Sequence, residues 1–227
     1  MKKYKGIIFD FNGTLFWDTP KHEQAWQIFA KESLNLEIDR REYYEKMHGS
    51  TNANIYKYLY KKDIEPENEL KFGQEKEEIY RRLCLEEKEK TGKLPLAPGA
   101  EQLLDFLKEN NIPCAIATSS ERINVDFFND VFNLRKWFEN RIIFADGTFR
   151  GKPFPDIYIK AGKLIDIPMK DLIIFEDANA GVQAAKSAGA GLVIGVAPYG
   201  KDEFVGKEYT DLIISDFTEF DFNLLER

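Results

Sequence analysis

The stretch Gly6–Thr14 (GIIFDFNGT) joins a short apolar run to a polar turn. Its first six residues read as a buried strand, and the Asn-Gly-Thr sequence that follows is typical of a turn. Asp10 lies where this strand ends. In open parallel sheets, ligands bind in the crevice at the carboxyl ends of the strands, so Asp10 is placed to face such a crevice. An aspartate that only opens a turn is the structural alternative.

Beyond this stretch, apolar runs alternate with helical patterns. Further strands are expected at Pro113–Thr118, Ile142–Ala145, Asp171–Phe175, Leu192–Val196 and, at an edge, Leu212–Ser215. Helices are expected at Gly99–Asn110, Asn124–Phe132, Pro155–Leu164 and Asn179–Ala188. Nearly continuous apolar strands separated by helices are typical of a parallel sheet covered on both faces. The sequence therefore predicts an α/β fold with a doubly wound, Rossmann-like parallel sheet.

Residues 17–92 differ in character, because they are rich in Lys, Glu, Tyr and Leu at helical spacing and predict no strand. Pro20 and Pro66 favour the starts of two helices. We interpret this segment as a helical cap domain inserted after the first strand, above the carboxyl edge of the sheet. The predicted domains are an α/β core at 1–16 and 93–227 and a cap at 17–92.

The composition limits the partners of the protein. Its 227 residues carry 32 Lys and Arg against 39 Asp and Glu, a net charge of −7, which argues against a nucleic-acid or membrane-surface binder. The two cysteines, Cys84 and Cys114, form no motif that suggests a disulfide framework or a zinc site. With no signal-like segment and no apolar run of membrane-spanning length, we expect a soluble, cytoplasmic protein. Its oligomeric state stays open, with a monomer favoured.

Three further segments carry residues suited to phosphate chemistry. Thr118 and Ser119 follow a strand and could hold a phosphate through hydroxyl and backbone N–H groups. Lys152, held in the turn GKPFPD, could neutralise carboxylates and phosphate. Glu176 and Asp177 follow a buried strand and offer the hard oxygen ligands that suit Mg²⁺. Helix caps, a surface turn and acids attracted by a helix dipole are the respective structural alternatives.

Together with Asp10, these segments fall at the carboxyl ends of separate predicted strands, so they should meet around one crevice. In this order, Asp10-x-Asn12-Gly13-Thr14, Thr118-Ser119, Lys152 in GKPFPD and Glu176-Asp177-Ala178-x-Ala180-Gly181 resemble the haloacid dehalogenase superfamily. In particular, they resemble its branch of β-phosphoglucomutase and small sugar-phosphate phosphatases. The resemblance covers essentially the whole chain, including a helical cap after the first strand.

This resemblance implies an enzyme that hydrolyses a small phosphorylated metabolite, expected to be a sugar phosphate, with Mg²⁺ as cofactor. Asp10 matches the nucleophile, which forms an aspartyl-phosphate intermediate. Mg²⁺ would be held by Asp10, the backbone carbonyl of Asn12, Asp177 and, directly or through water, Glu176. The phosphoryl oxygens would be bound by Gly13, Thr118, Ser119 and Lys152, of which Thr118 and Lys152 are also expected to be catalytic.

Position 12 departs from the family pattern, which usually has an acid/base Asp there. Asn12 cannot exchange a proton at neutral pH, so it cannot serve as general acid or base, although its backbone carbonyl can still ligate a metal. Three explanations of Asn12 remain open. The protein is a natural variant that turns over slowly or acts on substrates whose leaving group needs little protonation, or the cap supplies another acid. Alternatively, the usual aspartate has been deliberately replaced. Dehalogenases proper and phosphonatases also lack this Asp. Dehalogenases need no magnesium, and the Glu176–Asp177 pair argues against them. Phosphonatases need a cap lysine that the sequence does not place, so phosphate esters are the favoured substrates.

Five residues of the cap are candidates for contact with substrate: His22, Trp26, His48, Asn52 and Lys76. His22 precedes Trp26 as in the β-phosphoglucomutase branch, where this His lies near the acid/base; a surface or capping histidine is the alternative. His48 and Asn52 stand where the mutases have a Lys and an Arg, and loss of that Arg weakens the case for a bisphosphate. Lys76 lies among glutamates, so a surface ion pair is as good an interpretation.

Three functions follow from these observations. A Mg²⁺-dependent phosphatase is the leading hypothesis, because the cap favours hydrolysis over transfer. A phosphotransferase of the β-phosphoglucomutase type is the alternative within the family. A protein that binds a phosphorylated metabolite but has lost turnover through Asn12 is the third.

Overall fold

The computed structural model describes residues 2–47, 52–61, 65–202 and 204–226. The chain forms two compact units. The first, here called the α/β unit, comprises Met1–Trp17 and Pro95–Arg227. The second, here called the helical unit, comprises Asp18–Leu94. None of the described helices is both long and apolar enough to cross a membrane.

The α/β unit contains a six-stranded sheet in the order β3-β2-β1-β4-β5-β6. Its strands are β1 (Gly6–Phe9), β2 (Cys114–Glu121), β3 (Ile142–Ala145), β4 (Leu172–Glu176), β5 (Leu192–Val196) and β6 (Leu212–Ile214). Each neighbouring pair in the described residues runs parallel. The prediction of a doubly wound parallel sheet is confirmed.

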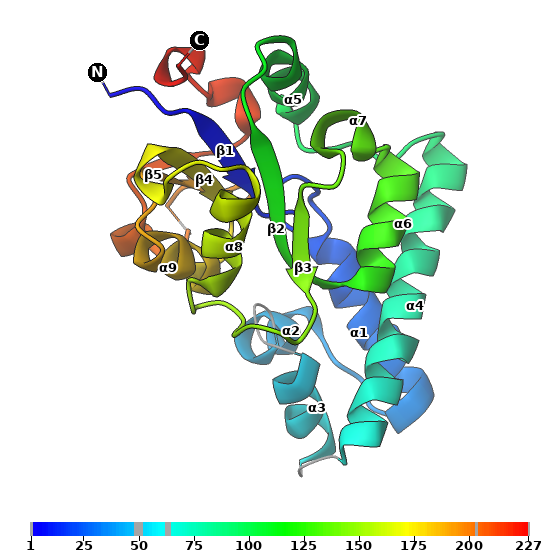
Figure 1. Ribbon diagram of the computed structural model, residues 1–227. Helices are drawn as coiled ribbons and strands as arrows, with labels where there is room; N and C mark the ends of the chain where they lie inside the picture. The colour runs from blue at the N-terminus through cyan, green and yellow to red at the C-terminus, as the bar shows by residue number, and fades with distance from the viewer. Residues whose placement is uncertain (1, 48–51, 62–64, 203, 227) are drawn as a thin grey trace. The chain divides into compact units, whose positions relative to one another are not determined.

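Helices cover both faces of this sheet. They are α5 (Ala100–Glu109), α6 (Arg122–Phe132), α7 (Arg135–Phe138), α8 (Asp156–Leu164) and α9 (Asn179–Ser187). Helices α8 and α9 pack on one face, whereas α6 and α7 pack on the other (Figure 1). Successive residues of a strand point to opposite faces, and all four residues of β1 are buried, so helices cover the sheet on both sides there. Ile8 of β1 packs in the cluster that contains α8 and α9, while Phe9 stacks on Phe175, with ring centroids 5.3 Å apart.

Strands β1, β2 and β4 differ from their predicted bounds at the edge where the site lies. β4 runs from Leu172 to Glu176 instead of from Asp171 to Phe175. β1 ends at Phe9 rather than Phe11. The backbone N–H of Asp10 still donates to the carbonyl of Phe175 at 3.0 Å, and the chain turns at the next residue. β2 continues to Glu121, and its register with β3 shifts between Ala117 and Glu121. This irregularity includes Thr118 and the two serines after it, so their side chains lie in a segment that a sequence pattern does not locate.

The helical unit is built from α1 (Thr19–Leu34), α2 (Arg40–Lys46), α3 (Asn52–Tyr60) and α4 (Pro66–Thr91). Pro20 lies in the first turn of α1 and Pro66 in that of α4. Backbone N–H groups in the first turn have no acceptor within the helix, so proline, which lacks this group, is tolerated there. The buried side chains of the unit include Trp26, Phe29 and Tyr56, whose rings pack edge to face. Within the described residues of this unit no strand forms, as predicted.

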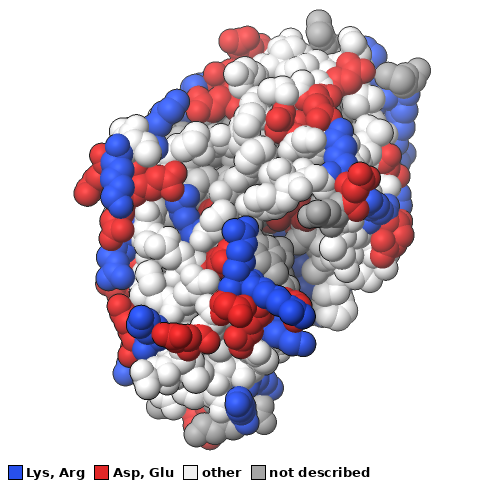
Figure 2. All heavy atoms as spheres, turned by 180° about the vertical axis from the view of Figure 1, so that it is seen from behind, with Lys and Arg blue, Asp and Glu red and all other residues white. Residues whose placement is uncertain are grey.

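Charged side chains of both signs are interspersed over the face of the molecule in Figure 2. This distribution agrees with the mixed composition of the chain, in which acids outnumber bases only slightly.

Candidate active site

The carboxylate of Asp10 is buried at the carboxyl end of β1 and forms an ion pair with Lys152. Asp10 is 6% exposed, and the Lys152 Nζ lies 2.5 Å from its Oδ1. The same Nζ lies 2.5 Å from Glu176 Oε1, at the end of β4. Burial disfavours the charged ammonium, but the attraction of Asp10 and Glu176 outweighs it and raises the pKa of Lys152 well above its ordinary value. Lys152 is therefore a fixed cation between two carboxylates.

A third carboxylate, Asp177, completes an acidic cluster with Asp10 and Glu176. One carboxylate oxygen from each of the three lies within 4.8 Å of the others. Burial, followed by the charges of Glu176 and Asp10, raises the pKa of Asp177 well above its ordinary value. Lys152 carries one positive charge and pairs with Asp10 and Glu176, whereas the cluster contains three carboxyl groups. Such a buried set of hard oxygen ligands fits a divalent cation.

Neighbouring groups fix the orientation of two of these acids. Glu176 Oε2 accepts the backbone N–H of Ala178 at 2.8 Å, and its Oε1 accepts the hydroxyl of Tyr158 at 3.1 Å. The Thr14 hydroxyl donates to Asp177 Oδ1 at 2.9 Å. The sequence prediction assigned no role to Thr14 or Tyr158. Thr14 lay in the quoted motif, and Tyr158 follows the GKPFPD turn on the buried face of α8, so their positions were the available signals.

Two glycines leave the space that the acids occupy. A Cβ on Gly13 would meet Asp177 Oδ2 at 2.1 Å, and its φ of +81° disfavours any other residue. A Cβ on Gly181, in α9, would meet Glu176 Oε1 at 1.7 Å. Both glycines are therefore required by the positions of the carboxylates rather than by the fold alone.

We expect Gly181→Ala to destabilise the α/β unit by about 1–3 kcal/mol, the usual cost of overpacking. The Glu176 carboxylate cannot move aside without losing its contacts with Lys152, Tyr158 and Ala178. Urea denaturation measures the free energy of unfolding. The matched control is Gly151→Ala, where an added Cβ meets nothing within 4 Å. Equal stability of the two variants would contradict the claim that Glu176 is held in place.

The side chain of Asn12 is held by hydroxyls of β2. Its Oδ1 accepts the Ser120 hydroxyl at 2.8 Å and, more weakly, the Thr118 hydroxyl at 3.4 Å. Thr118 Oγ1 in turn accepts the backbone N–H of Ser120 at 3.1 Å. The sequence prediction named Ser119, which is exposed, and omitted Ser120. Side chains alternate along a strand, but the predicted strand ended at Thr118, so the alternation was not extended to Ser120.

The cap candidates fall within the helical unit, each in a different setting. His48 lies outside the described residues, and Asn52 is the half-buried first residue of α3. Trp26 is 2% exposed and belongs to the hydrophobic core of the unit. The surface interpretation of Lys76 is wrong, because this residue is also only 2% exposed.

Lys76 and His22 belong to one polar cluster, in which Lys76 is buried and His22 half-buried. The Lys76 Nζ lies 2.8 Å from Glu77 Oε1 and 2.7 Å from His22 Nδ1. Because an ammonium only donates, His22 Nδ1 is the acceptor and the ring proton of the neutral histidine sits on Nε2. That Nε2 lies 3.3 Å from Asp18 Oδ2, which also accepts the Tyr80 hydroxyl. The Tyr80 ring stacks on His22 at 4.1 Å, so the imidazole is fixed in both position and tautomer.

We expect Lys76→Met to destabilise the protein by about 3–5 kcal/mol, because it removes the buried cation that lies beside the buried Glu77 carboxylate. The matched control on the same helix is Lys71→Met. Lys71 is exposed and lies 3.9 Å from Glu75, so its loss should cost less than about 1 kcal/mol. Thermal and urea unfolding of both variants test this difference. Similar, small losses would show that Lys76 is not a structural cation.

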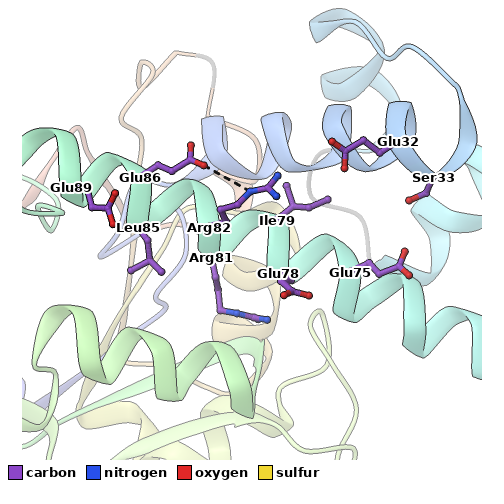
Figure 3. Close-up of a pocket in the computed structure, with 10 residues that line it drawn as sticks. All are labelled: Glu32, Ser33, Glu75, Glu78, Ile79, Arg81, Arg82, Leu85, Glu86 and Glu89. Carbon is purple, nitrogen blue, oxygen red and sulfur yellow. Dashed lines mark ion pairs between the residues drawn. The ribbon is translucent and has the colours of Figure 1, made fainter.

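The helical unit also carries an open groove between α1 and α4 (Figure 3). It is lined by Glu32, Ser33, Glu75, Glu78, Ile79, Arg81, Arg82, Leu85, Glu86 and Glu89. Arg82 lies 3.9 Å from Glu86 within this lining, so Glu86 already compensates part of the positive charge of the groove. Carboxylates outnumber guanidiniums along this lining, which makes the groove a poor site for an anionic phosphate.

The chain is similar to known proteins over most of its length. Residues 4–189 match the family described as haloacid dehalogenase-like hydrolase. The chain is 28% identical to fructose-1-phosphate phosphatase YqaB of Escherichia coli over 194 residues, which cover 83% of this chain and 94% of the relative. It is 27% identical to a phosphorylated carbohydrates phosphatase of Thermotoga maritima over 200 residues, 85% of each chain.

Two solved structures are similar over nearly the whole chain. A family IA, variant 3 hydrolase of Entamoeba histolytica has a TM-score of 0.88 and 36% identity, covering 99% of this chain and 97% of its own. A mutant CbbY of Rhodobacter sphaeroides in complex with xylulose-1,5-bisphosphate has a TM-score of 0.81 and 27% identity, covering 99% and 100%. The resemblance inferred from the sequence motifs is confirmed, and the chain belongs to the haloacid dehalogenase-like hydrolases.

Proposed function

We propose that this hydrolase is a Mg²⁺-dependent phosphatase of small phosphorylated carbohydrates that works through an aspartyl-phosphate on Asp10. The observation that carries the proposal is the buried Asp10 carboxylate, ion-paired to Lys152 and clustered with Glu176 and Asp177. Relatives named as phosphatases of fructose 1-phosphate and of phosphorylated carbohydrates support the substrate class. The xylulose bisphosphate in a similar structure also supports it.

The donor set supports magnesium as the cofactor. Asp10, Asp177 and the backbone carbonyl of Asn12 would hold the ion, with Glu176 acting directly or through water. Burial raises the pKa of Asp177, and the negative charges of Glu176 and Asp10 raise it further. A divalent cation would offset the repulsion between these carboxylates. When bound, Mg²⁺ would screen the repulsion between the carboxylate nucleophile and the anionic substrate and stabilise charge on the phosphoryl oxygens.

In the proposed reaction, an oxygen of the Asp10 carboxylate attacks phosphorus and the bond from phosphorus to the leaving oxygen breaks. Lys152 would hold Asp10 and a phosphoryl oxygen, since its ammonium has several donors and already contacts the Asp10 carboxylate. Thr118, Ser119 and the backbone around Gly13 would bind the remaining phosphoryl oxygens. Water then releases the phosphate from Asp10, slowly because Asn12 cannot act as a base.

The helical unit is proposed to act as the cap of this site. His22 and Lys76 would contribute polar groups toward the substrate, and Asn52 would bind its hydroxyls. Trp26 supports Lys76, whose Nζ lies 5.3 Å from the centroid of the indole ring. His48 remains a candidate from the sequence.

The function is tested with the purified chain, Mg²⁺ and a panel of sugar phosphates. Release of inorganic phosphate that stops on addition of EDTA and returns with excess Mg²⁺ would support the proposal. Interconversion of glucose phosphate isomers, dependent on a bisphosphate primer, would instead identify a mutase. Tight binding of a sugar phosphate with no chemical change would identify a binding protein.

A further inference from the structure

The side chain of Asn12 is held by two hydroxyls of β2. Ser120 and Thr118 both donate to its Oδ1, which fixes the orientation of the side chain. The Nδ2 amino group points away from this oxygen, and it can donate a hydrogen bond but cannot release a proton. Asn12 therefore has the shape of a protonated aspartate without its acidity.

The importance of that missing proton depends on the substrate. An alkyl phosphate expels an alkoxide, a strong base that needs a proton in the transition state. An acyl phosphate, the mixed anhydride of phosphoric and carboxylic acids, expels a carboxylate, whose conjugate acid has a pKa of about 4. A carboxylate departs as a stable anion, so a hydrogen bond is sufficient and a general acid adds little.

We propose that this site also dephosphorylates small acyl phosphates and takes them in preference to alkyl phosphates. The inference rests on the proposed role of Asp10 as nucleophile. An Asp10 oxygen bonds to phosphorus, the bond from phosphorus to the acyl oxygen breaks, and the electron pair leaves with the carboxylate. No proton moves in this step. Water then attacks the aspartyl-phosphate, the Asp10 carboxylate leaves, and the proton of water departs with the phosphate product into solvent.

The two steps of the reaction differ in whether they need an acid or base at position 12. The first needs no general acid with an acyl phosphate, whereas the second still lacks a general base for water. The phosphoenzyme should therefore form quickly and decay slowly. Mixing the protein with acetyl phosphate and Mg²⁺ should give a burst of acetate equal to the amount of enzyme, together with a phosphoryl group on the peptide that contains Asp10.

The experiment compares kcat/KM for acetyl phosphate and for glycerol phosphate in the unaltered chain and in Asn12→Asp. This ratio of constants reports the first, phosphorylating step. Asn12→Asp should raise kcat/KM for glycerol phosphate by roughly 10²–10⁴-fold, the usual contribution of a general acid. It should change the value for acetyl phosphate by less than about 10-fold, the scale of one hydrogen bond.

The outcomes separate this inference from the proposed function. An equal gain on both substrates, or a preference of the unaltered chain for glycerol phosphate, would overturn the inference while leaving an aspartyl-phosphate mechanism intact. Absence of a phosphoryl group on Asp10 with every substrate would overturn the proposed function as well. The unaltered chain alone decides the preference, so the inference stays testable if Asn12→Asp fails to fold. Asp10→Asn is the blank for phosphorylation at other residues.

Discussion

Asp10→Asn is expected to abolish phosphate release, with a loss in kcat on the order of 10⁶-fold, the scale seen when a covalent catalyst loses its nucleophile. The amide is nearly isosteric with the carboxylate, so the fold should persist, but it is neutral and does not attack phosphorus. Its neutral oxygen is also a weaker ligand for a hard cation. A phosphate-release assay and the mass of the acid-quenched protein measure the two expected losses, turnover and phosphoenzyme.

A matched control for this variant is Asp126→Asn in α6. Asp126 is exposed and ion-paired with Arg122, so the Asp126→Asn variant should keep full activity and nearly full stability. Circular dichroism and thermal unfolding show whether both variants fold. Substantial hydrolysis by folded Asp10→Asn would refute covalent catalysis by this residue.

Asn12→Asp is expected to raise turnover on unactivated sugar phosphates by roughly 10²-fold or more, because it supplies the acid and base that the site lacks. The hydroxyls of Ser120 and Thr118 that now contact Asn12 Oδ1 would equally donate to a carboxylate at this position. Steady-state assays across the sugar phosphate panel measure the gain.

An unchanged rate in Asn12→Asp would show that the general acid comes from another residue, and the cap histidines would become the candidates. His22→Gln is the companion variant, since it keeps a polar side chain of similar length. If His22 supplies the proton, this variant should lose activity in both backgrounds.

The sheet could be predicted because its strands are buried on both faces and therefore read as continuous apolar runs. The positions of the acids followed from the same pattern, since Asp10, Glu176 and Asp177 each stand at or just after the end of a strand. At β2, the pattern of apolar residues along the sequence does not predict how the side chains are placed. There, the register shift between Ala117 and Glu121 brings Ser120 to Asn12 and leaves Ser119 exposed.

Contacts between distant segments could not be predicted in the same way. Tyr158 reaches Glu176 from a helix, and Lys76 on α4 reaches His22 on α1. The glutamates beside Lys76 in sequence suggested a solvated helix face, but the periodicity of α4 turns this lysine inward against Trp26. A charged residue on a helix is placed by its partners in three dimensions, and these are not adjacent in the sequence.

The proposed mechanism requires a divalent cation held by Asp10 and Asp177 next to Glu176, with an oxygen of Asp10 accepting the phosphoryl group. Crystals grown with Mg²⁺ and beryllium fluoride test it most directly, because trifluoroberyllate bonded to an aspartate mimics the phosphorylated residue. We expect the fluoride complex on Asp10, with Mg²⁺ bound by Asp10 and Asp177 and Lys152 contacting a fluorine. Density for trifluoroberyllate on another residue, or a folded site with neither group at saturating concentrations, would contradict the account.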